Sequence, residues 1–433
     1  MEHLQHLECR LPSNIITQVR GSPEERAVRE AKRLARRYAS HDSTDDALLR
    51  RSNQYDVVEP VESGNEMTAG IAQDGTDYSY FIKVQLGSKG KEVYMLVDSA
   101  SGTSWVMGPD CKSMSCELHD SFGSSDSDTF EGSSDDFNIS YGTGKVKGKL
   151  ARDTISVAGV SFKFQLGIAT EASDDFQHYA FDGILGLSLG KGKTENFLDV
   201  MSEDGDLDKN IFSVALSRAS DGTDDGEILF GSIDPDRHEG KITYTDIVGG
   251  SDVWAIELEE MAYDGKKAGV GGIKTYIDTG STFIYGPQDV AEKIHSVIPD
   301  ATSSDGGLSF KVPCDSEKDL TFTFSGASYK LSPKDWISPP NSKGECTSNI
   351  YGHDVASGAL LLGATFVKNV YVVFDKDEKR IGMFNPTGKH RHVTNRFRLR
   401  PLSRSVKREC RDLQQYSPLE QRRCAGYFNR RAG

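Results

Sequence analysis

Long apolar runs are missing from this sequence of 433 residues. No stretch reaches the ~20 apolar residues that a transmembrane helix needs, and the C-terminus has no apolar tail of the lipid-anchor type. Residues 1–13 are polar, so they lack the apolar core of a secretory signal peptide. We therefore expect either a true start upstream of Met1 or a protein that is not exported conventionally, and we favour the first.

Signatures of bound metals and nucleotides are missing as well. The ten His and seven Cys residues show no metal-ligand spacing, and no glycine-rich phosphate-binding motif occurs. We therefore expect neither a metal nor a cofactor.

Positive charge is scarce in the middle of the chain. Residues 1–51 carry a net charge of +2 and residues 389–433 carry +10, whereas residues 52–388 carry −26. So acidic a body argues against nucleic-acid and anionic-membrane partners. It suits a protein that stays soluble and compact in acid, although an ordinary acidic surface would look the same.

What the chain does contain is a short pattern that occurs twice. Apolar, strand-like residues run into Asp98–Ser101 (Asp-Ser-Ala-Ser), and a second such run leads into Asp278–Ser281 (Asp-Thr-Gly-Ser). A half-buried aspartate needs hydrogen-bond donors, and the hydroxyl and N–H groups of such a turn supply them. The copies lie 180 residues apart, about one domain's length. This predicts a duplicated lobe with one carboxylate in each half, and it argues against two unrelated structural aspartates.

With these turns, the region from about Tyr78 to Pro386 resembles the pepsin family of aspartic endopeptidases. Further segments match the family's flap hairpin, its first core strand and its last strands: Ile139–Gly144, Phe181–Leu187, Leu361–Gly363 and Val373–Asp375. Trp105–Gly108 and Ser332–Asp335 are most similar to the secreted fungal branch. The resemblance implies an all-β, bilobal fold with a cleft between two related lobes. It also implies an endopeptidase that acts on proteins or peptides without a cofactor.

The resemblance gives each residue of the two turns a role. Asp98 and Asp278 would flank one water molecule and share one proton, as the family's carboxylate pair does. The other members would support this pair, the residue after each aspartate by linking the turns and the third residue on by bonding its own aspartate. These supporting residues are Ser99, Ser101, Thr279, Gly280 and Ser281.

A hairpin beyond the first turn would cover the substrate. By resemblance, Tyr141 closes over an extended peptide, and Gly142 and Thr143 offer it hydrogen bonds. Trp105, seven residues after Asp98, would hold this tyrosine. A surface hairpin tyrosine and a core tryptophan are the ordinary alternatives.

Two residues depart from the family pattern. Ala100 replaces the usual glycine, so the first turn must accept a methyl group and a φ angle that suits alanine. Ala364 stands where many relatives carry Asp, which removes a charge near the site. Ala100 leaves open a second hypothesis, a binding protein on the same fold that has lost catalysis. Peptide cleavage, and its inhibition by pepstatin, would separate the two.

The cysteines bear on the compartment. By resemblance, Cys111 pairs with Cys116 and Cys314 pairs with Cys346, and such disulfides form in oxidising compartments. We therefore expect a secreted or vacuolar protein; free thiols in a cytosolic protein are the alternative.

The N-terminal segment, residues 1–51, is expected to be a pro-segment. Glu24–Tyr38 has good helix formers and many Arg residues, so it would lie over an acidic cleft and inhibit the enzyme until it is removed. Arg50 and Arg51 form a dibasic processing site. A solvated, charged helix would explain the same residues.

The remainder is expected to divide into four segments. These are a linker or early mature strand at 52–76, an N-terminal lobe with the flap at 77–241, a C-terminal lobe at 242–388, and a basic, disordered tail at 389–433. We expect a monomer. Helices are predicted at Thr194–Met201 and Gln288–Ile298, and the Ser/Asp-rich stretch Ser121–Asp136 is predicted to be a surface loop.

Overall fold

Short strands dominate the fold, as the many brief runs of β-branched and aromatic residues predict. The computed structural model describes residues 55–61, 65–141, 144–204, 207–238, 240–250 and 252–386. These all belong to one unit, Met1–His390; a second unit, Arg391–Gly433, lies outside the described residues, as does the predicted pro-segment.

Strands of the first half alternate buried and exposed residues where one face meets solvent, as in Tyr80–Leu86 and Lys145–Val157. They are β1 (Thr68–Gln73), β2 (Tyr80–Leu86), β3 (Lys91–Asp98), β4 (Trp105–Met107), β5 (Glu131–Ser140), β6 (Lys145–Val157), β7 (Val160–Ala172), β8 (Gly183–Gly186), β9 (Ile211–Ala215) and β10 (Glu227–Phe230).

Strands of the second half are shorter, and Tyr371–Asp375 is buried along its whole length. They are β11 (Thr243–Asp246), β12 (Ala255–Leu258), β13 (Glu260–Tyr263), β14 (Lys266–Lys267), β15 (Ile273–Ile277), β16 (Ile284–Tyr285), β17 (Lys311–Val312), β18 (Leu320–Phe324), β19 (Ala327–Leu331), β20 (Cys346–Thr347), β21 (Ile350–Tyr351), β22 (Leu360–Leu362), β23 (Tyr371–Asp375) and β24 (Arg380–Phe384).

Helices are few and short among the described residues. They are α3 (Met114–Glu117), α4 (Phe197–Asp204), α5 (Gln288–Ser296), α6 (Pro333–Trp336) and α7 (Ala364–Val367), with the 3₁₀ turns η1 (Ser124–Asp126), η2 (Asp174–His178) and η3 (Ala219–Asp221). None of those helices is both long and apolar enough to cross a bilayer.

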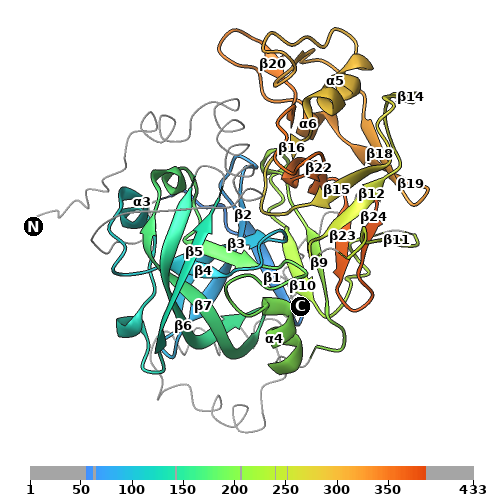
Figure 1. Ribbon diagram of the computed structural model, residues 1–433. Coiled ribbons are helices and arrows are strands. Elements are labelled where there is room, and N and C mark those ends of the chain that lie inside the picture. The colour runs from blue at the N-terminus through green and yellow to red at the C-terminus, as the bar shows by residue number, and fades with distance from the viewer. Residues whose placement is uncertain are drawn as a thin grey trace, which may run out of the picture. The chain divides into compact units, whose positions relative to one another are not determined.

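One large sheet joins the two halves of the chain. It has 13 strands in the order β11-β24-β23-β9-β10-β1-β2-β3-β8-β4-β7-β6-β5, so strands from the end of the chain lie beside strands from its beginning. The second half adds a five-stranded sheet, β12-β15-β22-β16-β21, and a four-stranded sheet, β14-β13-β18-β19. In Figure 1, β4–β7 lie on one side, β12, β15 and β18 lie on the other, and β9 and β10 lie between them.

The two halves repeat one strand arrangement around the predicted aspartates. In the first half, β3 pairs in parallel with β8, and β8 pairs antiparallel with β4. In the second, β15 pairs in parallel with β22, and β22 pairs antiparallel with β16. The predicted all-β, bilobal fold with two related lobes is therefore confirmed.

Of three elements predicted outside the motifs, one is present, one begins later than predicted, and one was wrong. The helix after Pro287 is present as α5. The helix expected at Thr194–Met201 begins later, at Phe197, because Asn196 caps it by accepting a hydrogen bond from the backbone N of Asp199. The stretch Ser121–Asp136 was wrongly predicted to be all loop, since β5 already begins at Glu131.

Candidate active site

Both aspartates of the duplicated turns are buried. Asp98 is the last residue of β3, and Asp278 directly follows β15; each is 0% exposed. The two aspartates have equivalent positions in the fold. Each lies at the end of the first strand of the three-strand arrangement that the two halves repeat. Apolar strands thus carry two ionisable groups into the interior, where only hydrogen bonds can compensate for lost hydration.

Reciprocal hydrogen bonds tie the two turns together. The backbone N of Ser99 donates to Oγ1 of Thr279, and the backbone N of Thr279 donates to Oγ of Ser99, both at 3.0 Å. Each hydroxyl then donates onward into the opposite strand, Ser99 to the carbonyl oxygen of Ile277 (2.9 Å) and Thr279 to that of Val97 (2.7 Å). A hydroxyl can accept and donate at once, which is why this position needs Ser or Thr. The structure thus contains the predicted link between the turns.

The carboxylates receive hydrogen bonds from their own turns. Oδ1 of Asp98 accepts from the backbone N of Ala100 (3.0 Å), and Oδ1 of Asp278 accepts from that of Gly280 (2.9 Å). Oδ2 of Asp278 also accepts from Oγ of Ser281 at 2.6 Å, as predicted. Such donors stabilise the ionised form of a carboxyl group.

The structure differs from the prediction at Ser101. Its hydroxyl donates to the carbonyl oxygen of Thr103 (3.1 Å) and accepts from the backbone N of Thr103 (3.4 Å). The expected bond from Ser101 to Asp98 was therefore wrong, because the serine hydroxyl is taken up by backbone groups two residues further on. The side-chain hydrogen bonds of the first turn therefore differ from those of the second.

The third residue of each turn shows how closely the turns approach. A Cβ atom at Gly280 would lie 2.4 Å from Cγ of Asp98, far inside van der Waals contact. Glycine at this position therefore lets the second turn lie against the carboxyl group of the first. Neither Gly280 nor Ala100 has a positive φ angle. Alanine at position 100 is thus compatible with its backbone conformation, which was the concern that the sequence raised.

The flap tyrosine is held as expected. Tyr141 is 1% exposed and connects β5 to Gly144 and β6, with mutual backbone hydrogen bonds between residues 141 and 144. Nε1 of Trp105 donates to Oη of Tyr141 at 2.6 Å. The expected substrate-binding residues Gly142 and Thr143 lie outside the described residues.

Phe176 of η2 packs with Trp105 and Tyr141, although the sequence did not indicate it as a residue of the site. Its ring contacts those of Trp105 and Tyr141 edge-on, with centroids 5.3 and 6.0 Å apart. A single Phe in the polar run Asp174–His178 was the only available signal, since a buried aromatic there needs a packing partner.

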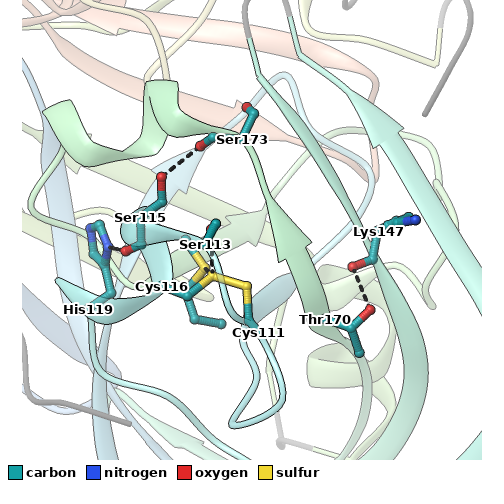
Figure 2. The surroundings of a disulfide bond; sticks show 9 residues. Cys111, Ser113, Ser115, Cys116, His119, Lys147, Thr170 and Ser173 are labelled. Carbon is teal, nitrogen blue, oxygen red and sulfur yellow. Dashed lines mark hydrogen bonds between the residues drawn. A yellow bond between two sulfur atoms is a disulfide. The ribbon is translucent and has the colours of Figure 1, made fainter. Parts of the chain in front are cut away.

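Both predicted disulfides are present. Cys111 is bonded to Cys116, with Cα atoms 5.8 Å apart, and Cys314 is bonded to Cys346, with Cα atoms 5.3 Å apart. Figure 2 shows the first of these beside Ser113 and Ser115.

The processing site and the metal-ligand types were also compared with the structure's described residues. The proposed processing site at Arg50 and Arg51 lies outside the described residues. Among the residues that are described, no group of three or more His, Cys, Asp or Glu side chains is arranged to hold a metal ion.

Comparison with known proteins agrees with the geometry. A family model described as eukaryotic aspartyl protease matches residues 79–385. The chain is 37% identical over 340 residues to a probable aspartic-type endopeptidase CTSD from Arthroderma benhamiae, a match that covers 77% of this chain and 66% of that relative. It is 37% identical over 345 residues to aspartic-type endopeptidase ctsD from Aspergillus fumigatus (78% and 72%). It is also 34% identical over 318 residues to pepsin A from Sus scrofa (71% and 81%).

The match to the Arthroderma protein spans just under two thirds of that relative's length, whereas the match to pepsin A spans four fifths. The family model covers well over half of this chain and contains both aspartate turns, the flap tyrosine and both disulfides. This protein therefore belongs to the eukaryotic aspartyl proteases, a family of hydrolases.

Proposed function

We propose that this protein is an aspartic endopeptidase that hydrolyses peptide bonds with a water molecule activated between Asp98 and Asp278. The observation that carries the proposal is the reciprocal pair of Ser99 and Thr279 hydrogen bonds, which fixes two buried carboxylates on facing turns. The names of the relatives, aspartic-type endopeptidase and pepsin A, support the same activity.

The chemistry follows from two acids that share one proton. The ionised carboxylate takes a proton from water, and the protonated one donates to the substrate carbonyl oxygen as the tetrahedral intermediate forms. Like charges held close together resist double ionisation, so the shared proton is retained in mildly acidic solution and is lost at higher pH. We therefore propose an acidic pH optimum.

The substrate is proposed to be an extended segment of protein. The flap hairpin β5–β6 offers backbone groups for β-type pairing, and apolar side chains would suit the aromatic cluster around Tyr141, Trp105 and Phe176. We propose that about seven or eight extended residues are bound, as the resemblance to the pepsin family implies. The two disulfides favour an oxidising compartment, and we propose that the protein is secreted or vacuolar.

Two matched variants test the mechanism. Asp98→Asn and Asp278→Asn keep the shape of each side chain but can neither share nor pass the proton, so we expect both to abolish hydrolysis of a fluorogenic peptide. Pepstatin should inhibit the native protein. Hydrolysis that persists in either variant, once a contaminating protease is ruled out, would contradict the mechanism. Tight pepstatin binding without any hydrolysis would instead favour the binding-protein hypothesis raised by Ala100.

A further inference from the structure

A buried histidine lies beside the first disulfide, away from the two aspartates. His119 follows α3 and is 0% exposed. Nδ1 of its ring contacts the carbonyl oxygen of Ser115, and Nε2 lies 2.9 Å from the carbonyl oxygen of Tyr179. Figure 2 shows the ring next to Ser115 and the disulfide.

Both contacts are hydrogen bonds only when the ring carries two protons. A carbonyl oxygen accepts and never donates, and neutral imidazole has one N–H group. The neutral ring therefore points one lone pair at a carbonyl lone pair, whereas imidazolium donates to both oxygens. Burial lowers the pKa of His119 from its ordinary value of 6.5, opposed by the two carbonyl contacts and by the charge of Asp120. The second proton is thus bound only at a pH below that ordinary value, and the two carbonyl contacts and Asp120 favour its binding.

The histidine and its neighbour Ser115 hold the two ends of η2. Tyr179 follows η2 and contacts His119, and Ser173 precedes η2 and accepts a 2.8 Å hydrogen bond from Oγ of Ser115 at its carbonyl oxygen. Ser173 also binds the base of the flap, because its backbone N donates to the carbonyl oxygen of Lys145 and its Oγ accepts from the backbone N of Lys145, both at 2.9 Å. The position of η2 is therefore coupled to the flap hairpin.

Phe176 carries this coupling to the flap tyrosine. Its ring packs edge-on against Trp105 and Tyr141. A Cβ atom added to Gly144, at the other side of the hairpin tip, would lie 2.8 Å from the Phe176 ring, so hairpin and η2 are in close contact. A displacement of η2 must therefore move Tyr141 or open a gap beneath it.

The titratable groups around the His119 ring come from its own loop and from the elements that adjoin it. Asp120 favours the imidazolium form; it pairs with Lys91 of β3, and its backbone N donates to Asp182. The ring of Tyr55 lies against His119 with centroids 5.0 Å apart, and its Oη donates to the carbonyl oxygen of Gln177 at 2.5 Å. The other titratable residues of the adjoining elements are Glu117, Asp174, Asp175, His178 and Tyr179.

We propose that His119 is a positioning residue for peptide hydrolysis, which as imidazolium fixes η2 and Phe176 and thereby sets Tyr141 for substrate. Loss of the second ring proton removes one of the two hydrogen bonds and loosens this arrangement. The role in hydrolysis rests on the proposed function, whereas the coupling between His119 and the flap is a property of the fold and can be measured alone.

The coupling is tested by nuclear magnetic resonance in the Asp98→Asn protein, which cannot digest itself. A titration from neutral to acidic pH follows the His119 ring and the indole N–H of Trp105, which reports on the flap through its bond to Tyr141. We expect both signals to shift with one midpoint. In His119→Phe and His119→Gln, the indole shift should disappear. The titration of the parent protein is decisive even if one variant fails to fold.

His295 provides a matched control. Its Nδ1 also faces a carbonyl oxygen four residues earlier, that of Ala291 at 2.7 Å, but its buried Nε2 has no hydrogen-bond partner among the described residues. His295→Phe should therefore leave the Trp105 shift unchanged. The proposal would be overturned if the Trp105 signal did not shift as His119 titrates, or if it still shifted with pH in His119→Phe.

Turnover by the native protein tests the role in hydrolysis. KM for a peptide should rise as His119 loses its proton, by about tenfold or more, which is what one charge-assisted hydrogen bond supplies, with a smaller change in kcat. His119→Phe should show a high KM at every pH, and His295→Phe should follow the native profile. Unchanged KM profiles in His119→Phe would refute this role. Coupled signals without any hydrolysis by native protein would refute the proposed function but leave the coupling intact.

Discussion

At the scale of single residues, the third position of the second turn leaves no space for a side chain. A methyl group at Gly280 would collide with the carboxyl group of Asp98, at 2.4 Å from Cγ. We expect Gly280→Ala to lower kcat/KM at least about 100-fold, because displacements near 1 Å at reacting groups have effects of that size. Peptide kinetics measure the loss, and pepstatin binding should fall in parallel. Near-native kinetics would show that the turns separate easily.

Ala100→Gly is the matched change in the other turn. Ala100 already lacks a positive φ angle, so glycine relieves no backbone strain there. The variant should retain or raise activity, the latter if the methyl group crowds the pair. A large loss of activity would show instead that the methyl group supports the first turn, and it would remove the argument that alanine impairs this site.

Sequence could predict the residues of the site better than their bonds. The repeated Asp turn identified both carboxylates, and the resemblance to the pepsin family implied the Ser99–Thr279 link. The sequence could not predict that the hydroxyl of Ser101 bonds to Thr103, because this partner depends on the exact path of the loop. Phe176 was missed for the same reason: its neighbours Trp105 and Tyr141 come from distant parts of the chain.

At the scale of elements, α5 contains a histidine that weakens the fold in acid. His295 stacks on Phe310, with ring centroids 3.7 Å apart, and burial lowers its pKa to about 4. The unfolded chain binds this proton near pH 6.5, so stability is full above that value and is lost as the pH falls toward 4. The difference corresponds to about 3 kcal/mol of unfolding free energy.

His295→Phe removes this titration and keeps the ring stacking. Urea unfolding of the Asp98→Asn protein, with and without His295→Phe, should therefore show a smaller acid-induced loss of stability when the histidine is absent. The comparison between neutral pH and about pH 4 cancels any packing difference between the two rings. Identical losses in both proteins would mean that His295 stays neutral over this range.

Edge strands were the elements hardest to predict. Strand β5 is mostly exposed and Ser/Asp-rich, so its residues lack the alternation of apolar side chains that marks a strand. Its stability comes mainly from pairing with β6, and exposed cross-strand charge pairs such as Lys149 with Asp136, 2.7 Å apart, add little. By contrast, α5 follows Pro287 and has a regular apolar face, and the sequence alone predicted it.

At the scale of the whole molecule, a buried charge network connects distant parts of the chain. Lys368 lies 3.0 Å from both Asp77 and Asp335, and Arg218 donates from Nε to Asp335 at 2.7 Å. Burial opposes the charge of Arg218, but Asp335 and Asp221 outweigh it and raise the pKa of Arg218. These residues come from both halves, so the network and the shared 13-stranded sheet together oppose separation of the halves.

The uneven charge of the chain also predicts how the protein matures. Residues 52–388 carry a net charge of −26, so we expect them to attract the Arg-rich segment that precedes them at neutral pH. In acid the carboxylates become protonated, the attraction weakens, and cleavage after Arg51 would make the release permanent. Protein 14–433 should therefore be slower than 52–433 at neutral pH and should approach it in acid; both keep the basic tail, so any difference comes from residues 14–51. Initial rates on one peptide measure it. Equal rates at every pH, or a native N-terminus well upstream of Arg50, would show that the segment does not inhibit.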